Sequence, residues 1–216
     1  MQNRITATIT TAIAAVSIAS LLAPASADSV TFDYSSLHET GFPGGEFIAE
    51  FANGSTYRTF CLESDEELSV SYNLSYQYSL DTDGAVGGGA SGGSPDPISS
   101  ATASVYLGWL NGDIDQTTEN STAVQNAIWA LEGEIDPNSL DGNAEDIYNE
   151  AVANFSTSDN AITDNELFSN LRVLNPFRDI EGERFYYQSQ IILIPLPAAS
   201  GLALAGLAAV GMRRRR

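Results

Sequence analysis

The stretch "FIAEFANGSTYRTFCLE", residues 47–63, guides the interpretation of the rest of the chain. Two runs rich in aromatic and β-branched residues flank Asn53-Gly54. This dipeptide suits a tight turn because both residues tolerate a positive φ. The stretch therefore predicts two antiparallel strands joined by a hairpin.

The segments that follow the hairpin predict a strand and then a loop. Apolar and aromatic residues alternate with serine, asparagine and glutamine between residues 68 and 80, and a period of two is typical of a half-buried strand. The alternating residues are Leu68, Val70, Tyr72, Leu74, Tyr76, Tyr78 and Leu80. The next stretch, "DTDGAVGGGASGGSPDP" (81–97), lacks the apolar residues needed to pack a core and predicts a mobile loop.

Helical spacing replaces strand spacing between residues 99 and 155. The first predicted helix is capped by Ser99 or Ser100 and ends at Asn111-Gly112. The second is capped by Ser121 or Thr122 and stops at Gly133, and the third carries an apolar stripe over 144–155.

Strand character returns in "NLRVLN" (170–175) and "RFYYQSQIILIP" (184–195). The order strands, helices, strands predicts one α+β domain over residues 28–194, with an antiparallel sheet or barrel-like arrangement and a helical insert.

Composition excludes several classes of partner. The chain has 216 residues, of which 43% are hydrophobic, enough for one domain with a core. It has no lysine, and within residues 28–194 four arginines stand against 28 acidic residues, a formal charge of −24. Such a body repels phosphate backbones and anionic headgroups, so we expect no nucleic-acid binding and no polybasic membrane surface.

Residues 1–27 have the features of a secretory signal peptide. Arg4 provides the positive region, residues 12–23 the apolar stretch, and Ala25-Ser26-Ala27 the small-residue cleavage motif. We therefore expect an exported protein whose mature chain begins at Asp28.

Residues 195–216, "PLPAASGLALAGLAAVGMRRRR", combine two prolines, a short apolar stretch and four arginines. The apolar part, residues 198–212, is shorter than the ~20 residues of a comfortable membrane span. A plain tail anchor is one interpretation. The order of elements also resembles the PEP-CTERM sorting tails of Gram-negative bacteria, in the variant with a leading Pro-Leu-Pro motif. The sorting elements are Pro195, Leu196, Pro197, Arg213, Arg214, Arg215 and Arg216.

This resemblance implies transient retention in the inner membrane, with the arginines on the cytoplasmic side. It also implies removal of the tail by an exosortase-type protease and release to the cell surface or an extracellular matrix.

Several kinds of chemistry find no support in the residues. His38 is the only histidine, lies in a predicted solvated loop, and has no GxSxG serine to form a triad with. One cysteine and one histidine cannot make a zinc ligand set, and the aspartate-rich turns do not match a calcium loop. We expect neither a metal nor another cofactor.

Cys61 is the only cysteine, so it has no disulfide partner within the chain. It is either a small buried hydrophobic residue or a chemically committed thiol. Gln125, in "STAVQNAIWALEGE" (121–134), places a polar group beside an apolar helical stripe, with Trp129 one turn further on. A boundary glutamine bonded to the main chain is the simpler interpretation of Gln125.

The pairing of "FCLE" with "VQNAIW", whose glutamine follows the cysteine by 64 residues, resembles the thioester domains of bacterial surface adhesins. In those domains an aromatic-Cys motif and a TQxAIW-type helix join through an internal Cys–Gln bond; here Val124 replaces the usual threonine. The resemblance covers roughly residues 55–133. It implies a Cys61–Gln125 thioester that acylates an amine or hydroxyl group on a partner, once per molecule rather than with turnover.

Such a bond needs aromatic walls that exclude water. The candidates are Tyr57, Phe60, Tyr106, Trp109 and Trp129. The alternative function is an exported structural or exopolysaccharide-associated protein in which Cys61 and Gln125 merely pack together.

Overall fold

The computed structural model describes residues 29–42, 44–70, 74–87, 90 and 93–194. The predicted signal peptide (1–27) and sorting tail (195–216) lie outside the described residues. Within the described ranges, no helix is both long enough and apolar enough to cross a bilayer.

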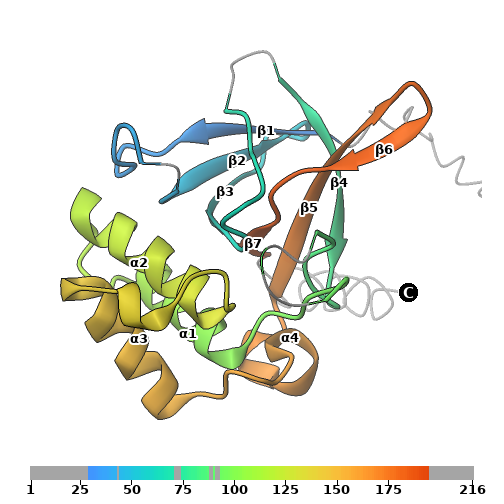
Figure 1. The fold of residues 1–216 in the computed structure, drawn as a ribbon. Helices are drawn as coiled ribbons and strands as arrows, with labels where there is room; N and C mark the ends of the chain where they lie inside the picture. The colour runs from blue at the N-terminus through green and yellow to red at the C-terminus, as the bar shows by residue number, and fades with distance from the viewer. Residues whose placement is uncertain (1–28, 43, 71–73, 88–89, 91–92, 195–216) are drawn as a thin grey trace, which may run out of the picture.

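Antiparallel strands form a closed barrel, which confirms the predicted α+β class with a barrel-like sheet (Figure 1). The order around the barrel is β4-β1-β2-β3-β7-β5, and β5 pairs back with β4 to close six strands, while β6 extends the sheet from β5. Closure pairs the edge strands, which would otherwise be open to other chains. The strands are β1 (Ser29–Tyr34), β2 (Phe47–Phe51), β3 (Thr56–Cys61), β4 (Tyr76–Asp81), β5 (Leu171–Ile180), β6 (Glu183–Tyr186) and β7 (Gln190–Leu193).

The β2–β3 hairpin forms where the sequence predicted it. Phe47 pairs with Thr59 and Glu50 with Thr56, and the turn passes through Gly54 at φ 84°. A positive φ of this size is costly for most side chains, which explains the glycine.

Among the described residues of the alternating stretch 68–80, only those from Tyr76 onward form a strand, so the predicted strand is too long. β4 begins at Tyr76, whereas Leu68 and Val70 lie outside any strand. Both pack against a second hydrophobic cluster, which includes Phe32, Tyr76 and Ile192 of the barrel strands. The Tyr76 hydroxyl donates to the main-chain oxygen of Ser69 at 3.0 Å. The alternation therefore reflects burial, not continuous strand pairing.

The glycine-rich stretch differs from the predicted free loop at its two ends. Ala85 and Asp96 exchange two main-chain hydrogen bonds of 2.8 Å, and Ala85 is buried. Gly84 has a φ of 137°, and a Cβ there would lie 2.0 Å from the Asp96 oxygen. Only glycine allows this approach.

The helical insert lies between β4 and β5 and gathers on one side of the barrel (Figure 1). Ser99 caps the first helix as predicted, and Gly112 ends it in the left-handed conformation. The second helix begins earlier than predicted, because Thr117 is its cap, and it ends at Leu131. The elements are α1 (Ser100–Asn111), α2 (Thr118–Leu131), η1 (Pro137–Ser139), α3 (Gly142–Asn154), α4 (Ala161–Asp164) and η2 (Glu166–Phe168).

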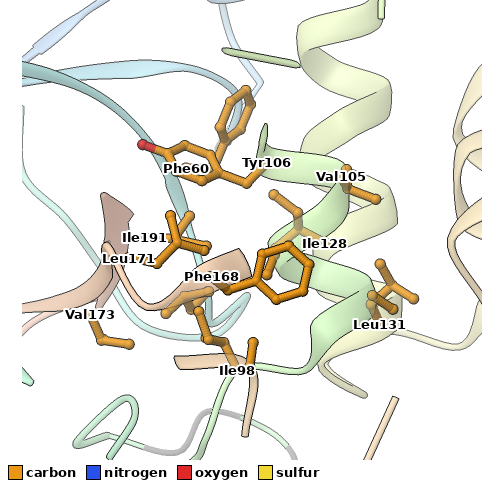
Figure 2. Close-up of a cluster of buried hydrophobic side chains, with 14 of the residues drawn as sticks. Phe60, Ile98, Val105, Tyr106, Ile128, Leu131, Phe168, Leu171, Val173 and Ile191 are labelled. Atoms are coloured by element: carbon orange, nitrogen blue, oxygen red, sulfur yellow. The ribbon is translucent and has the colours of Figure 1, made fainter. Parts of the chain in front are cut away.

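The main core lies between the barrel and the insert. Figure 2 shows Phe60 and Ile191 from the barrel in one cluster with Val105 and Ile128 from the helices. Successive side chains of a strand point to opposite faces, so Cys61 belongs to a different cluster from Phe60. The strand β3 therefore presents its last side chain away from the main core.

Candidate functional site

The Cys61 side chain is fully buried at the end of β3. It packs with Phe47 of β2 and Trp129 of α2, and Phe42 lies against the same cluster. In the β3–β7 ladder the partner of Cys61 is Gln190. Facing residues of a ladder place their side chains on the same side of the sheet, so this pairing brings an amide to the thiol.

Two glutamine side chains contact the sulfur. The Cys61 thiol donates to Gln188 Oε1 at 2.9 Å, and Gln190 Nε2 donates to the Cys61 sulfur at 3.1 Å. Sulfur is larger than nitrogen or oxygen, so both are close contacts. Burial raises the pKa of the Cys61 thiol, the nearby Glu63 charge adds to the rise, and the Gln190 hydrogen bond opposes it. The resting sulfur is therefore a protonated thiol.

The two amides are themselves held in place. Gln190 Oε1 accepts from the Thr59 hydroxyl at 3.2 Å, and its Nε2 also donates to the Gln188 main-chain oxygen at 3.3 Å. Gln188 Nε2 donates to the main-chain oxygen of Glu63. The orientation of Gln190 is thus fixed by β3 and by the residues just before β7, and that of Gln188 by the segment just after β3.

Gln125 lies at the same site but contacts the main chain of Cys61. Its Oε1 accepts from the Cys61 amide at 3.1 Å and from the Gly45 amide at 3.2 Å, and its Nε2 donates to the Cys61 carbonyl at 2.7 Å. Ser121, Gln125 and Trp129 are spaced four residues apart on α2, so they share one face of the helix. The structure brings the predicted pair together, and the covalent Cys61–Gln125 bond stays a prediction.

Of the five aromatic residues predicted to wall the site, Trp129 packs with Cys61. Phe60, Tyr106 and Trp109 lie in the main core, where Phe60 makes edge-on contacts with both others. Tyr57 packs edge-on against Phe51.

Sequence reasoning missed the two glutamines at the sulfur. Gln190 begins the otherwise apolar strand β7, and Gln188 lies two residues before it, a spacing that puts both side chains on one face of an extended segment. Two polar side chains on one face of a buried strand require partners, which is the signal that could have identified them.

His38 lies in a loop, as predicted, but its ring is half-buried against aromatic side chains rather than solvated. Its ring lies 4.3 Å from the Tyr34 ring and 5.0 Å from the Phe47 ring, centroid to centroid. Burial lowers the pKa of His38, so the ring is neutral near pH 7. Within the described part of the chain, no group of three or more histidine, cysteine or acidic side chains is placed to hold a metal ion.

Comparison with models of known protein families, with characterised proteins and with solved structures gave no match.

Proposed function

We propose that the protein is an exported covalent binder, a surface or matrix adhesin, that carries an internal thioester on Cys61. The observation that supports this is a fully buried thiol in close contact with the amides of Gln188 and Gln190. A thiol that only fills a core needs no amide groups around it, and desolvated polar groups are costly unless they are paired.

Among the three glutamines, Gln188 is the acyl partner that the contacts favour. Its carbonyl oxygen faces the thiol, whereas Gln190 directs an N–H at the sulfur and Gln125 bonds the main chain. We assign Gln190 as the donor that stabilises the sulfur as it loses its proton, and Gln125 as a positioning residue for Cys61. The Cys61–Gln125 bond is the competing assignment.

The proposed bond formation balances without a further reactant. The Cys61 Sγ attacks the Gln188 Cδ, the Cδ–Nε2 bond breaks, and the thiol proton leaves with the nitrogen as ammonia. Holding the sulfur and the amide together supplies the proximity that the step requires. A partner's amine or hydroxyl group then attacks the thioester carbonyl, takes the acyl group, and returns a proton to the sulfur.

Burial protects such a bond from hydrolysis. Cys61 and Gln190 are fully buried, Gln188 is 4% exposed, and Phe47 and Trp129 form apolar walls. The reaction consumes the bond, so the protein binds once and is not a turnover enzyme.

The sequences of the two terminal segments support a location outside the cell. The signal-like residues 1–27 and the tail 195–216 suggest export, transient inner-membrane retention and processing by an exosortase-type protease. The unknown target is then a protein or polysaccharide outside the cell.

Intact-mass spectrometry of freshly purified protein tests the proposal. We expect a mass one ammonia below that of the sequence and a thiol that resists alkylation in the native state. Methylamine should add its full mass to the thioester form and release one titratable thiol. Gln188→Ala should show no ammonia loss, whereas Gln77→Ala, an exposed glutamine of β4, should behave as the wild type.

Peptide mapping distinguishes the acyl partners. Methylamide on Gln188 supports the assignment, and methylamide on Gln125 or Gln190 moves the acyl group to that residue while keeping the thioester. A wild-type mass equal to the plain sequence, with an alkylatable thiol in fresh protein, would overturn the thioester. That result would leave the structural or exopolysaccharide-associated function.

A further inference from the structure

A groove of about 510 Å³ lies between α1, α3 and η2. Its volume is within the range of pockets that hold small molecules. Among the residues that line it, Leu167 of η2 is 75% exposed and Phe155, directly after α3, is 38% exposed. Exposed apolar residues that adjoin one another in this way indicate a binding surface. The principal apolar lining residues are Leu107, Ile114, Ile147, Phe155, Leu167 and Phe168.

Gly108 of α1 leaves room for the groove. Glycine within a helix is less favourable than alanine. A Cβ at Gly108 would lie 3.8 Å from the Ile114 Cδ1, its nearest neighbour apart from the helix's own backbone, so close packing does not require glycine here. Gly108 itself lines the groove, and a longer side chain at this position would take up part of its volume. The glycine therefore keeps the groove open.

The wall that carries Leu167 is held by local hydrogen bonds. The Leu167 amide donates to the Asn165 side-chain oxygen at 3.0 Å, and the Phe168 amide donates to the Asn165 carbonyl at 3.0 Å. The rings of Phe168 and Phe155 lie 6.1 Å apart, centroid to centroid, and connect η2 to the end of α3. The groove is thus formed before any ligand arrives, which lowers the entropic cost of binding.

The charges around the groove are negative. Asp113 and Glu150 line it, and none of the described residues that line it is basic. The Asp113 amide donates to the Gly108 carbonyl at 2.9 Å, which holds Asp113 beside the open position on α1. Asn111 and Asn154, the last residues of α1 and α3, also line the groove, and neither helix has a basic residue in its last turn. The C-terminus of a helix carries a partial negative charge, so both helix ends add to the attraction for a cation.

We propose that the groove binds a small amphipathic cation, an apolar chain or ring that ends in an ammonium group. The apolar part packs against Ile147, Phe155 and Leu167. The ammonium group lies near Asp113 or Glu150 and the two helix ends. Anionic molecules with the same apolar part are repelled by these groups and by the formal charge of −24 over residues 28–194. This inference does not depend on the thioester, because the groove belongs to the main core's side of the helices and Cys61 to another cluster.

A nuclear magnetic resonance titration of the full chain, with each probe below its micelle-forming concentration, tests the site. The probes are octyltrimethylammonium, octanoate, which has a similar chain and the opposite charge, and tetramethylammonium, which lacks the chain. None carries an amine or hydroxyl group that could react with a thioester. We expect octyltrimethylammonium to shift the amide signals of Gly108 and Leu167 until they saturate. Octanoate should bind at least about tenfold more weakly because its charge is repelled, and tetramethylammonium should have no measurable effect.

Variants separate the groove from the overall charge. Gly108→Leu should reduce the affinity for octyltrimethylammonium by about tenfold or more by filling the groove. Leucine favours helices and has space at this position, so the fold is retained, which thermal unfolding checks. Asp113→Asn combined with Glu150→Gln should reduce the affinity by about fivefold. The matched control combines Glu50→Gln and Glu183→Gln, exposed residues of β2 and β6, and should leave the affinity within about twofold of the wild type.

Three results would overturn the proposal. The first is octanoate binding as tight as that of octyltrimethylammonium, or signal shifts only outside the groove. The second is unchanged binding by a folded Gly108→Leu variant. The third is an equal loss of affinity in the two double variants, because the overall charge and not the groove would then govern binding.

Discussion

Gln125 satisfies both main-chain polar groups of Cys61. Its side-chain amide donates to the Cys61 carbonyl at 2.7 Å and accepts from the Cys61 amide at 3.1 Å, so it bonds Cys61 as a neighbouring strand would. The helical insert thereby completes the ladder at the end of β3, on the side opposite β7. This contact couples the position of α2 to the thiol.

Replacing Gln125 should destabilise the fold whether or not a thioester forms. Gln125→Ala leaves the buried amide and carbonyl of Cys61 without partners, at roughly 1–3 kcal/mol for each group. We expect a loss of about 2 to 6 kcal/mol in the free energy of unfolding, measured by urea denaturation. Gln77→Ala, at an exposed site of β4, is the matched control. Equal stability of the two variants would contradict this role for Gln125.

Gly44→Ala should disturb the same contact by steric means. A Cβ at Gly44 would lie 2.5 Å from the Gln125 Cγ and 2.6 Å from the Trp129 Cη2, so one of these side chains must move. We expect a destabilisation of about 1–3 kcal/mol, as for other overpacked cores. At Gly108 in α1 the nearest atom is 3.8 Å away, so Gly108→Ala should be neutral or stabilising. Thermal unfolding of both variants checks the contrast.

Glu132 makes stability depend on pH. Its carboxylate accepts from the Ser99 amide and hydroxyl and from the Thr102 hydroxyl at the start of α1. Burial raises the pKa of Glu132 from 4.5 to about 7. The folded state therefore holds this proton more tightly than the unfolded chain, and stability falls as the pH rises from about 4.5 to about 7.

Glu132→Gln mimics the protonated form and should remove this dependence. Between pH 4.5 and pH 7.5, the free energy of unfolding of the variant should rise by on the order of 2 kcal/mol relative to that of the wild type. This is less than the full pKa shift implies, because the residue is partly exposed to solvent. Urea denaturation across that range provides the measurement. Parallel pH profiles for the two proteins would show that the Glu132 proton is not linked to folding.

Arg58 should contribute more to the free energy of unfolding than its partial exposure suggests. It pairs with the buried Glu46, which also accepts from the Trp109 indole at 2.7 Å. Arg58→Ala leaves that carboxylate without its cation, so we expect a loss of roughly 3 kcal/mol. Combining Arg58→Ala with Glu46→Gln should restore part of the lost stability, because the buried group is then uncharged.

The exposed pair Arg184–Asp179 provides the control for Arg58. Arg184→Ala should change the free energy of unfolding by less than about 1 kcal/mol, since exposed ion pairs contribute little. Comparable losses at Arg58 and Arg184 would show that burial of Glu46 does not govern the effect.

Local patterns predicted the elements well where one residue type determines the backbone. Gly54 and Gly112 mark the hairpin and the helix end, and Ser99 the cap, because each satisfies a requirement within a few residues. The motifs "FCLE" and "VQNAIW" also singled out Cys61 and Gln125. The two residues are in contact because β3 and α2 pack together.

The rest of the site depends on a pairing that local patterns do not encode. Cys61 meets Gln190, and Gln188 two residues before it, because β3 pairs with β7, strands separated by the entire helical insert. Hydrophobic periodicity gives the faces of a strand but not its neighbours. The strand predicted over 68–80 is longer than β4 for a related reason. Leu68 and Val70 are packed against other side chains but lie outside any strand.

Under the proposed export, the pairing of β3 with β7 would also set an order of events. Cys61 crosses the membrane well before Gln188 and Gln190 if the chain is threaded from its N-terminus, because they lie 127 and 129 residues further on. Until Gln188 emerges just ahead of β7, Cys61 would lack its proposed acyl partner and would be exposed to oxidants and to other thiols.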